Sequence, residues 1–168
     1  GGGKTELLQS LNKLPNIFPL SSLTPQTFIS GMRGENNSLL FKINGKIVVF
    51  KDFTTILSAH SDAQMEILGQ LREIYDGHFH KEFGTGASFD WHGKIGFVAG
   101  VTSVIDKHTS VHKSLGERFL QYRIQQPDRK EVMIRIRQNI FNQKEMRKAL
   151  TGAIASYIKG VKIPNNMA

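Results

Sequence analysis

The sequence predicts an α/β fold in which helices cover a largely parallel sheet. The run IVVF at 47–50 is apolar at every position, as a strand covered on both faces would be, and KIGFVAG at 94–100 is similar. Apolar residues at helical spacing alternate with these runs and prevail after residue 125. We therefore expect a parallel sheet sandwiched by helices, a β-hairpin insertion and a small C-terminal helical section.

The composition is that of an ordinary globular protein. The 168 residues are 39% hydrophobic and 21% charged, which suits a core at 1–125 followed by a helical section at 126–168. The absence of cysteine excludes disulfides and thiolate metal sites and favours a cytoplasmic location. No apolar run approaches the roughly 20 residues of a membrane span, so no membrane partner is expected. The net charge of +8 instead predicts a polyanionic partner: nucleotide phosphates, DNA or RNA.

Sequence patterns in the first third of the chain predict a helix, a strand and a hairpin. Leucines at 7, 8, 11 and 14 indicate a helix over 5–14 that Pro15 ends. A short strand and loop at 16–24, one or two helical turns at 25–30 and a polar loop at 32–37 follow. The dipeptide Asn44-Gly45 lies between the apolar runs SLLFKI and KIVVF, which predicts a tight turn between two strands.

The remaining elements follow the same patterns. Ser61 is expected to cap a helix that ends at Gly77, with Met65 and Tyr75 among the residues of its apolar face. Aromatic and polar residues alternate on both sides of Gly84-Thr85-Gly86, which predicts a β-hairpin. Beyond residue 100 we expect a helix at 109–115, a short strand at 119–124, and helices at 128–140 and 142–159.

The segment GGGKT at the start of the chain matches the end of the phosphate-binding pattern G-x-x-x-x-G-K-[ST]. Backbone amides of such a loop would bind phosphates, which places Gly1, Gly2 and Gly3 in the cofactor site with Lys4 and Thr5; the Thr5 hydroxyl would also bind Mg²⁺. The first glycine of the pattern would precede residue 1, so the chain is expected to be a fragment. A glycine leader before an ordinary helix is the alternative.

Asp52 ends the apolar run KIVVFKD, where a carboxylate can hold the Mg²⁺ of a bound nucleotide. A surface aspartate that starts a turn is the alternative. Because this aspartate and the glycine-rich segment occur in the order that a nucleotide site needs, together they predict binding of ATP and Mg²⁺.

These motifs, with KDFTTILS, LREIYDG, FGTG, GVT and GERFL in sequence, resemble P-loop ATPases of the AAA+ type, especially ATPases of phages and mobile elements that are often labelled helicases. The resemblance covers residue 1 to about residue 124. It implies a P-loop fold and an ATP-hydrolysing motor core that acts on DNA, as in a helicase or translocase, in a homo-oligomeric ring.

The resemblance also implies catalytic roles for Asp52, Thr102 and Arg118. Thr102 follows the strand where AAA+ proteins place the residue that senses the γ-phosphate, although it could simply cap the next turn. Arg118, in GERFL, matches the arginine finger that reaches a neighbouring subunit. A salt bridge to Glu117 or a helix end is its alternative, and Arg123 competes for the finger role. Arg147 lies where an AAA+ lid often carries a second arginine.

One departure concerns the catalytic base. Many AAA+ ATPases have Asp-Glu at the end of the Mg²⁺ strand, whereas this chain has Asp52-Phe53. Glu73 or Asp76 could substitute as the base if either reaches the attacking water. A nucleotide-binding assembly or nucleic-acid module without significant turnover is therefore the alternative function, and the arginine-phenylalanine segment argues against a small-molecule kinase.

Two regions could contact nucleic acid. Lys81 and Trp91 of the predicted hairpin could bind backbone and bases, although its aromatic residues could equally pack on the core. The basic residues between 129 and 148 could form a second face or a solvated helix surface. His78 and His80 are a weak metal pair on their own, and no structural metal beyond Mg²⁺ is expected.

Overall fold

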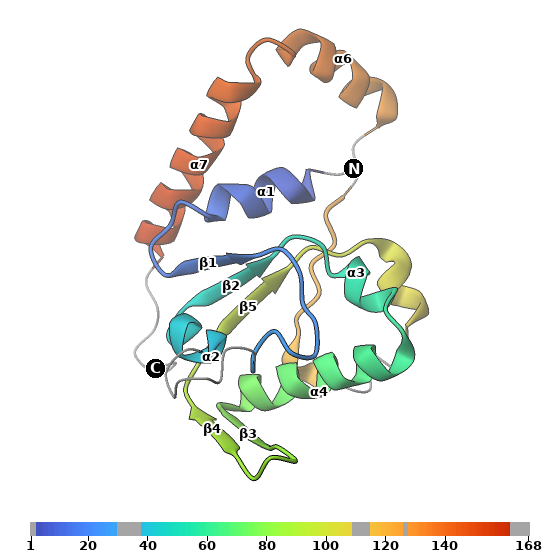
Figure 1. Ribbon diagram of the computed structural model, residues 1–168. Helices are drawn as coiled ribbons and strands as arrows, with labels where there is room; N and C mark the ends of the chain where they lie inside the picture. The colour runs from blue at the N-terminus through green and yellow to red at the C-terminus, as the bar shows by residue number, and fades with distance from the viewer. Residues whose placement is uncertain (1–2, 30–37, 109–114, 126–127, 162–168) are drawn as a thin grey trace. The chain divides into compact units, whose positions relative to one another are not determined.

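The computed structural model describes residues 3–29, 38–108, 115–125 and 128–161 (Figure 1). Contacts within the chain divide it into two compact units. We call Asn16–Gln121 the sheet unit, and Gly1–Pro15 with Tyr122–Ala168 the helical unit.

A three-stranded parallel sheet forms the centre of the sheet unit. Its strands are β1 (Ile17–Leu20), β2 (Ile47–Phe50) and β5 (Gly96–Ala99), in the order β1-β2-β5. In β2, three of the four residues are buried, as the wholly apolar run predicted. The expected mixed α/β fold with a parallel sheet is confirmed.

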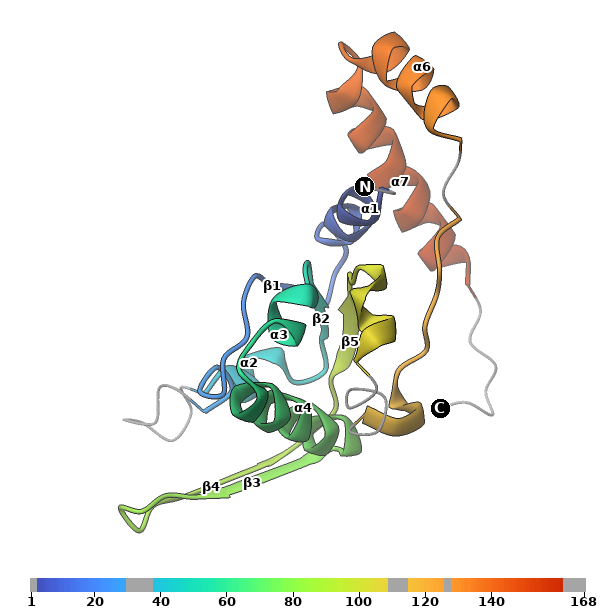
Figure 2. The same ribbon diagram turned by 90° about the vertical axis from the view of Figure 1, so that its right-hand side faces the viewer.

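Helix α4 (Ser61–Asp76) packs against one face of this sheet, next to the short helix α3 (Thr54–Leu57) (Figure 2). Its buried residues Ile67, Leu68, Leu71 and Ile74 share the core with Val48 and Phe50 of β2. The helix ends at Gly77, where a φ of 89° requires the left-handed conformation that glycine adopts readily.

The boundaries of α4 follow the sequence prediction closely, but its faces differ in detail. His60 occupies the cap position, one residue before the expected Ser61. Met65 and Tyr75 are 60% and 53% exposed, although their spacing placed them on the apolar face. At 100° per residue Met65 lies about 60° outside the buried stripe, whereas Tyr75 lies within its angular range but in the last turn of the helix.

The predicted hairpin around Asn44-Gly45 is wrong. Residues 39–43 form helix α2 (Leu39–Ile43), and β2 pairs in parallel with β1 and β5. The Ser38 hydroxyl accepts a hydrogen bond from the Leu40 amide and so caps the helix. Leu40 and Ile43 are both fully buried, a spacing of three that fits a helix as well as it fits an apolar strand.

A β-hairpin of β3 (His78–Glu82) and β4 (Ser88–His92) follows α4, as predicted. The 3₁₀ helices η1 (Ser103–Lys107) and η2 (Gly116–Arg118) come after β5. No strand occurs at 119–124, so that prediction is wrong, and 25–29 form turns rather than a helix. The polar loop expected at 32–37 and most of the helix expected at 109–115 lie outside the described residues.

The helical unit consists of α1 (Lys4–Leu11), α6 (Arg129–Asn139) and α7 (Gln143–Gly160), all three close to their predicted positions. Helix α1 packs against α7. Neither α6 nor α7 has a buried residue. The contacts thus group α1 with the C-terminal helices, whereas the sequence suggested a core of 1–125.

Candidate functional site

The carboxyl ends of β2 and β5 lie side by side, and polar residues follow both strands. The ladder continues beyond the strands, because the Gly100 amide donates to the Phe50 carbonyl at 3.0 Å and the Phe53 amide donates to the Gly100 carbonyl at 2.7 Å. These two bonds hold the loop that carries Asp52 next to the loop that carries Thr102. Ligands of open α/β sheets bind at this edge.

A threonine links the two loops. The Thr54 and Thr102 hydroxyls are 3.3 Å apart, and the Thr102 amide donates to the Thr54 hydroxyl at 3.4 Å. Asp52 Oδ1 accepts a hydrogen bond from the Thr54 amide at 3.0 Å. The result is an exposed cluster of one carboxylate and two hydroxyls, which are the oxygen ligands that Mg²⁺ prefers.

Asp52 and Thr102 also have the local roles that the sequence left open. Asp52 starts the turn that leads into α3, and Thr102 precedes η1, whose Ile105 amide donates to the Thr102 carbonyl at 3.2 Å. The Thr102 side chain makes no capping bond of its own. Because these roles use one oxygen of Asp52 and the backbone of Thr102, they are compatible with a ligand at this edge.

The phosphate-binding candidates belong to the helical unit. Gly1 and Gly2 lie outside the described residues. Gly3 adopts the left-handed conformation with φ 72°, and α1 begins at Lys4. Thr5 is exposed in the first turn of this helix. The amides of a first turn lack partners within the helix and favour anions.

Arg118 forms a bidentate salt bridge with Asp76. Its Nε and Nη2 atoms donate to the two carboxylate oxygens at 2.9 and 2.8 Å. This hydrogen bonding holds the pKa of Asp76 below its ordinary value and raises the pKa of Arg118. Asp76 ends α4 beside the hairpin, at the edge of the sheet where β5 begins (Figure 1). Neither Asp76 nor Arg118 therefore adjoins Asp52 and Thr102 within the sheet unit.

The hairpin places its aromatic residues in the core. Trp91 is 1% exposed and Phe79 is 3% exposed, so no base can stack on the Trp91 ring. The predicted contact of Trp91 with nucleic acid is therefore wrong. Lys81 remains partly accessible and pairs with Glu66 of α4 at 3.1 Å.

Positive charge is concentrated in the helical unit. This unit contains 12 Lys and Arg against 4 Asp and Glu, whereas the sheet unit contains 10 of each. An open groove of about 620 Å³ between α1 and α7 is lined by six charged residues. They are Lys13, Lys144, Arg147 and Lys148 with the carboxylates Glu6 and Glu145. Arg147 donates to both oxygens of Glu6, at 2.7 and 2.8 Å, which raises the pKa of Arg147.

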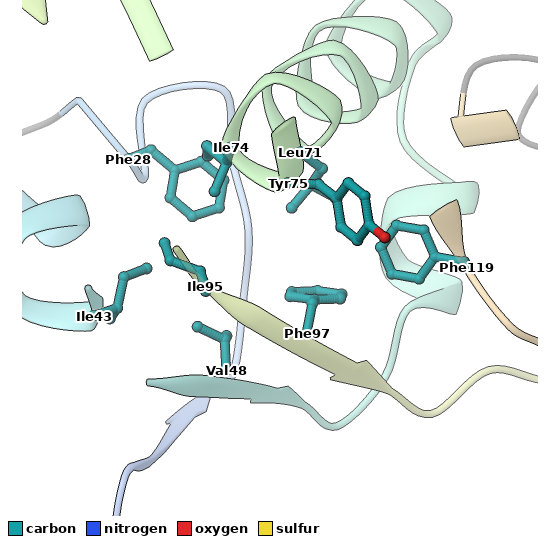
Figure 3. Close-up of a pocket in the computed structure, with 9 residues that line it drawn as sticks. All are labelled: Phe28, Ile43, Val48, Leu71, Ile74, Tyr75, Ile95, Phe97 and Phe119. Atoms are coloured by element: carbon teal, nitrogen blue, oxygen red, sulfur yellow. The ribbon is translucent and has the colours of Figure 1, made fainter. Parts of the chain in front are cut away.

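A recess beneath α4 is apolar and small. Its volume is about 20 Å³, and Figure 3 shows Tyr75 and Leu71 of α4 above Phe97 of β5, with Phe119 beside Tyr75. Such a volume suits about one water molecule. The recess is therefore a packing feature of the core.

Comparison with protein-family models, curated proteins and solved structures found no match to this chain. None of the described helices combines the length and apolar character that crossing a membrane requires.

Sequence reasoning missed two groupings. The Arg118–Asp76 pair joins residues 42 positions apart, and no local sequence pattern predicts it. The cluster of His78, His80, Asp90 and His92 on the hairpin could have been found. Once the hairpin centres on Gly84-Thr85-Gly86, the period of two places these residues on one face.

Proposed function

We propose that this chain is part of an ATPase motor core that binds Mg²⁺–ATP and acts on DNA. The observation that carries the proposal is the cluster at the carboxyl edge of the sheet, where Asp52 lies beside the Thr54–Thr102 pair. In the proposed site, Lys4 and Thr5 bind the phosphates and the metal, Asp52 binds the hydrated Mg²⁺, and Thr102 contacts the terminal phosphate.

The identity of the general base separates this function from its alternative. Phe53 follows Asp52 and is 4% exposed, so no carboxylate occupies the next position. Asp76 is paired with Arg118, while Glu73 is exposed on α4. This observation favours, as the second candidate, a module that binds nucleotide without significant turnover.

A double-mutant cycle on the full natural protein tests whether the two sets of residues act on one nucleotide. Lys4→Ala and Asp52→Asn are each expected to reduce Mg²⁺–ATP hydrolysis by about a hundredfold or more. The double variant should lose little beyond either single variant, because effects on one site are not additive. Lys13→Ala, in the turn just beyond the end of the same helix, is the matched control.

Three outcomes distinguish the candidates. Normal hydrolysis in Lys4→Ala would refute the ATPase proposal. Tight nucleotide binding without phosphate release, in oligomeric protein with DNA present, would select the module without turnover. Independent, additive effects would mean that Lys4 and Asp52 do not share a nucleotide.

A finger role for Arg118 requires its guanidinium to exchange Asp76 for a phosphate bound to a neighbouring subunit. Mixed oligomers test this step. Arg118→Ala and Lys4→Ala should each be inactive alone, but a mixture should regain activity, since the intact Lys4 of one subunit meets the intact Arg118 of the other. A mixture that remains inactive while mixed oligomers form would argue against a finger in trans.

The proposed DNA partner relies on the positive charge of the helical unit. DNA affinity should fall steeply with salt, because Lys and Arg release counterions from the phosphates they contact. Lys144→Ala with Lys148→Ala should weaken binding and reduce the salt slope by about two. Lys42→Ala with Lys46→Ala, which removes two charges from the sheet unit, is the control, and an equal loss there would contradict the assignment.

A further inference from the structure

One exposed face of the hairpin gathers three histidines and an aspartate. His78 lies directly opposite His92, and His80 lies opposite Asp90, so a single face of the two-stranded ribbon carries all four side chains. The buried face carries Phe79, Phe89 and Trp91 instead. The core therefore fixes the register, and the register brings the four polar side chains together.

Asp90 lies at about the separation from two histidine nitrogens that a tetrahedral metal requires. Asp90 Oδ1 lies 3.5 Å from His78 Nε2 and 3.1 Å from His92 Nε2. All three ligand atoms lie within 4.8 Å of one another. With bonds of about 2.0–2.1 Å at tetrahedral angles, two ligand atoms of Zn²⁺ are about 3.3 Å apart. Both distances from Asp90 Oδ1 are close to this value.

We propose that His78, Asp90 and His92 bind a transition-metal dication of the Zn²⁺ type. Two imidazoles and one carboxylate suit Zn²⁺ and its neighbours in the first row, and they suit Ca²⁺ poorly because that ion takes oxygen ligands. Three protein ligands leave a fourth position open to water or to a donor from another molecule. The site is separate from the proposed nucleotide site and does not depend on it.

The residues around these ligands orient them. His80 Nδ1 lies 3.3 Å from Asp90 Oδ2, the oxygen that the metal does not use, and His80 Nε2 lies 3.1 Å from Glu82 Oε1. The carboxylate of a metal site is commonly fixed by such a second hydrogen bond. His80 is therefore a positioning residue rather than a ligand.

The His78 and His92 rings are already close to parallel. Their centroids are 4.5 Å apart and their planes differ by 22°. The two imidazoles present their Nε2 atoms to the side of the hairpin where Asp90 lies. A cation between them would replace weak ring contacts with coordinate bonds across both strands.

Metal titration of the protein, without a histidine tag, tests the proposal. Calorimetry should show one Zn²⁺ per chain, and Co²⁺ should produce the intense visible absorption of a tetrahedral site. His80→Ala should weaken Zn²⁺ binding by about tenfold. His78→Ala, His92→Ala and Asp90→Asn should each weaken it further.

His60→Ala is the matched control, because His60 is an exposed histidine outside the hairpin that pairs with Asp62 at 3.8 Å. The variants change exposed side chains, and circular dichroism would verify that each remains folded. The proposal is overturned if the natural chain binds no Zn²⁺, or if the affinity of the ligand variants equals that of the natural chain and His60→Ala.

Discussion

The two units of this protein differ in net charge and in the burial of their apolar residues. The sheet unit has balanced charge and contains every residue of the main buried cluster, from Leu23 to Leu115. The helical unit carries the whole net charge of +8, and large apolar residues such as Ile134 and Phe141 are 55% and 96% exposed on it. We therefore expect stability to depend mainly on the sheet unit, and the DNA binding proposed above to depend on the helical unit.

The largest expected effect is the loss of a core ring from the sheet unit. Phe50 is fully buried, and its ring meets those of Phe53 and Phe97 at 6.3 Å. Phe50→Ala should lower the free energy of unfolding in urea by about 3–5 kcal/mol. Ile134→Ala on α6 should change it by no more than about 0.5 kcal/mol. Comparable losses in the two variants would abolish the contrast between the units.

A glycine pair tests the turn that joins α4 to the hairpin. A Cβ at Gly77 would stand 3.0 Å from the Gly93 carbonyl oxygen, and the backbone there has a φ of 89°. Gly77→Ala should therefore cost about 1–2 kcal/mol in urea unfolding. Gly69→Ala, within α4 and with nothing within 4 Å of the added Cβ, should stabilise by up to about 1 kcal/mol. The expected result is that the two substitutions change the free energy of unfolding in opposite directions.

Acid should weaken the contact between Arg118 and Asp76. Because the pKa of Asp76 in the folded protein lies below its ordinary value of 3.8, the pair stabilises the fold above that value, and the stabilisation is lost as pH falls through the folded-state pKa. Arg118→Gln should be less stable than the natural chain at neutral pH and converge with it in strong acid, as measured by thermal unfolding. A difference that stays constant across this range would contradict the pairing.

The smallest effect is expected in the helical unit. Glu6→Gln removes the carboxylate that binds Arg147, on side chains that are 41% and 58% exposed. The unfolding temperature should fall slightly at low salt and not at all near 1 M salt, where the screening length is about 3 Å. Glu145→Gln, in the same groove, serves as the reference.

Local patterns predicted most elements of the fold. The apolar run of β2, the periodicity of α4 and the alternation around Gly84-Thr85-Gly86 each specify their element within a few residues. The strand predicted for LLFKI was wrong because a five-residue segment rich in apolar residues fits a helix and a strand equally well. The Ser38 cap favours the helix.

The candidate sites depended more on contacts between distant segments. Asp52 and Thr102 could be predicted to share an edge, since both follow strands expected to be parallel. The burial of Trp91 and the pairing of Arg118 with Asp76 could not, because each depends on packing between segments far apart in sequence. The same holds for the grouping of α1 with α7.

The bond from the Thr54 amide to Asp52 Oδ1 has a consequence for binding at the sheet edge. A free aspartate samples several rotamers, and a cation that binds it must pay the entropy of selecting one. The turn has already selected the Asp52 rotamer, and Oδ2 has no bonding partner among the described residues. A cation that reaches this edge would therefore meet an acceptor whose conformational freedom was lost during folding.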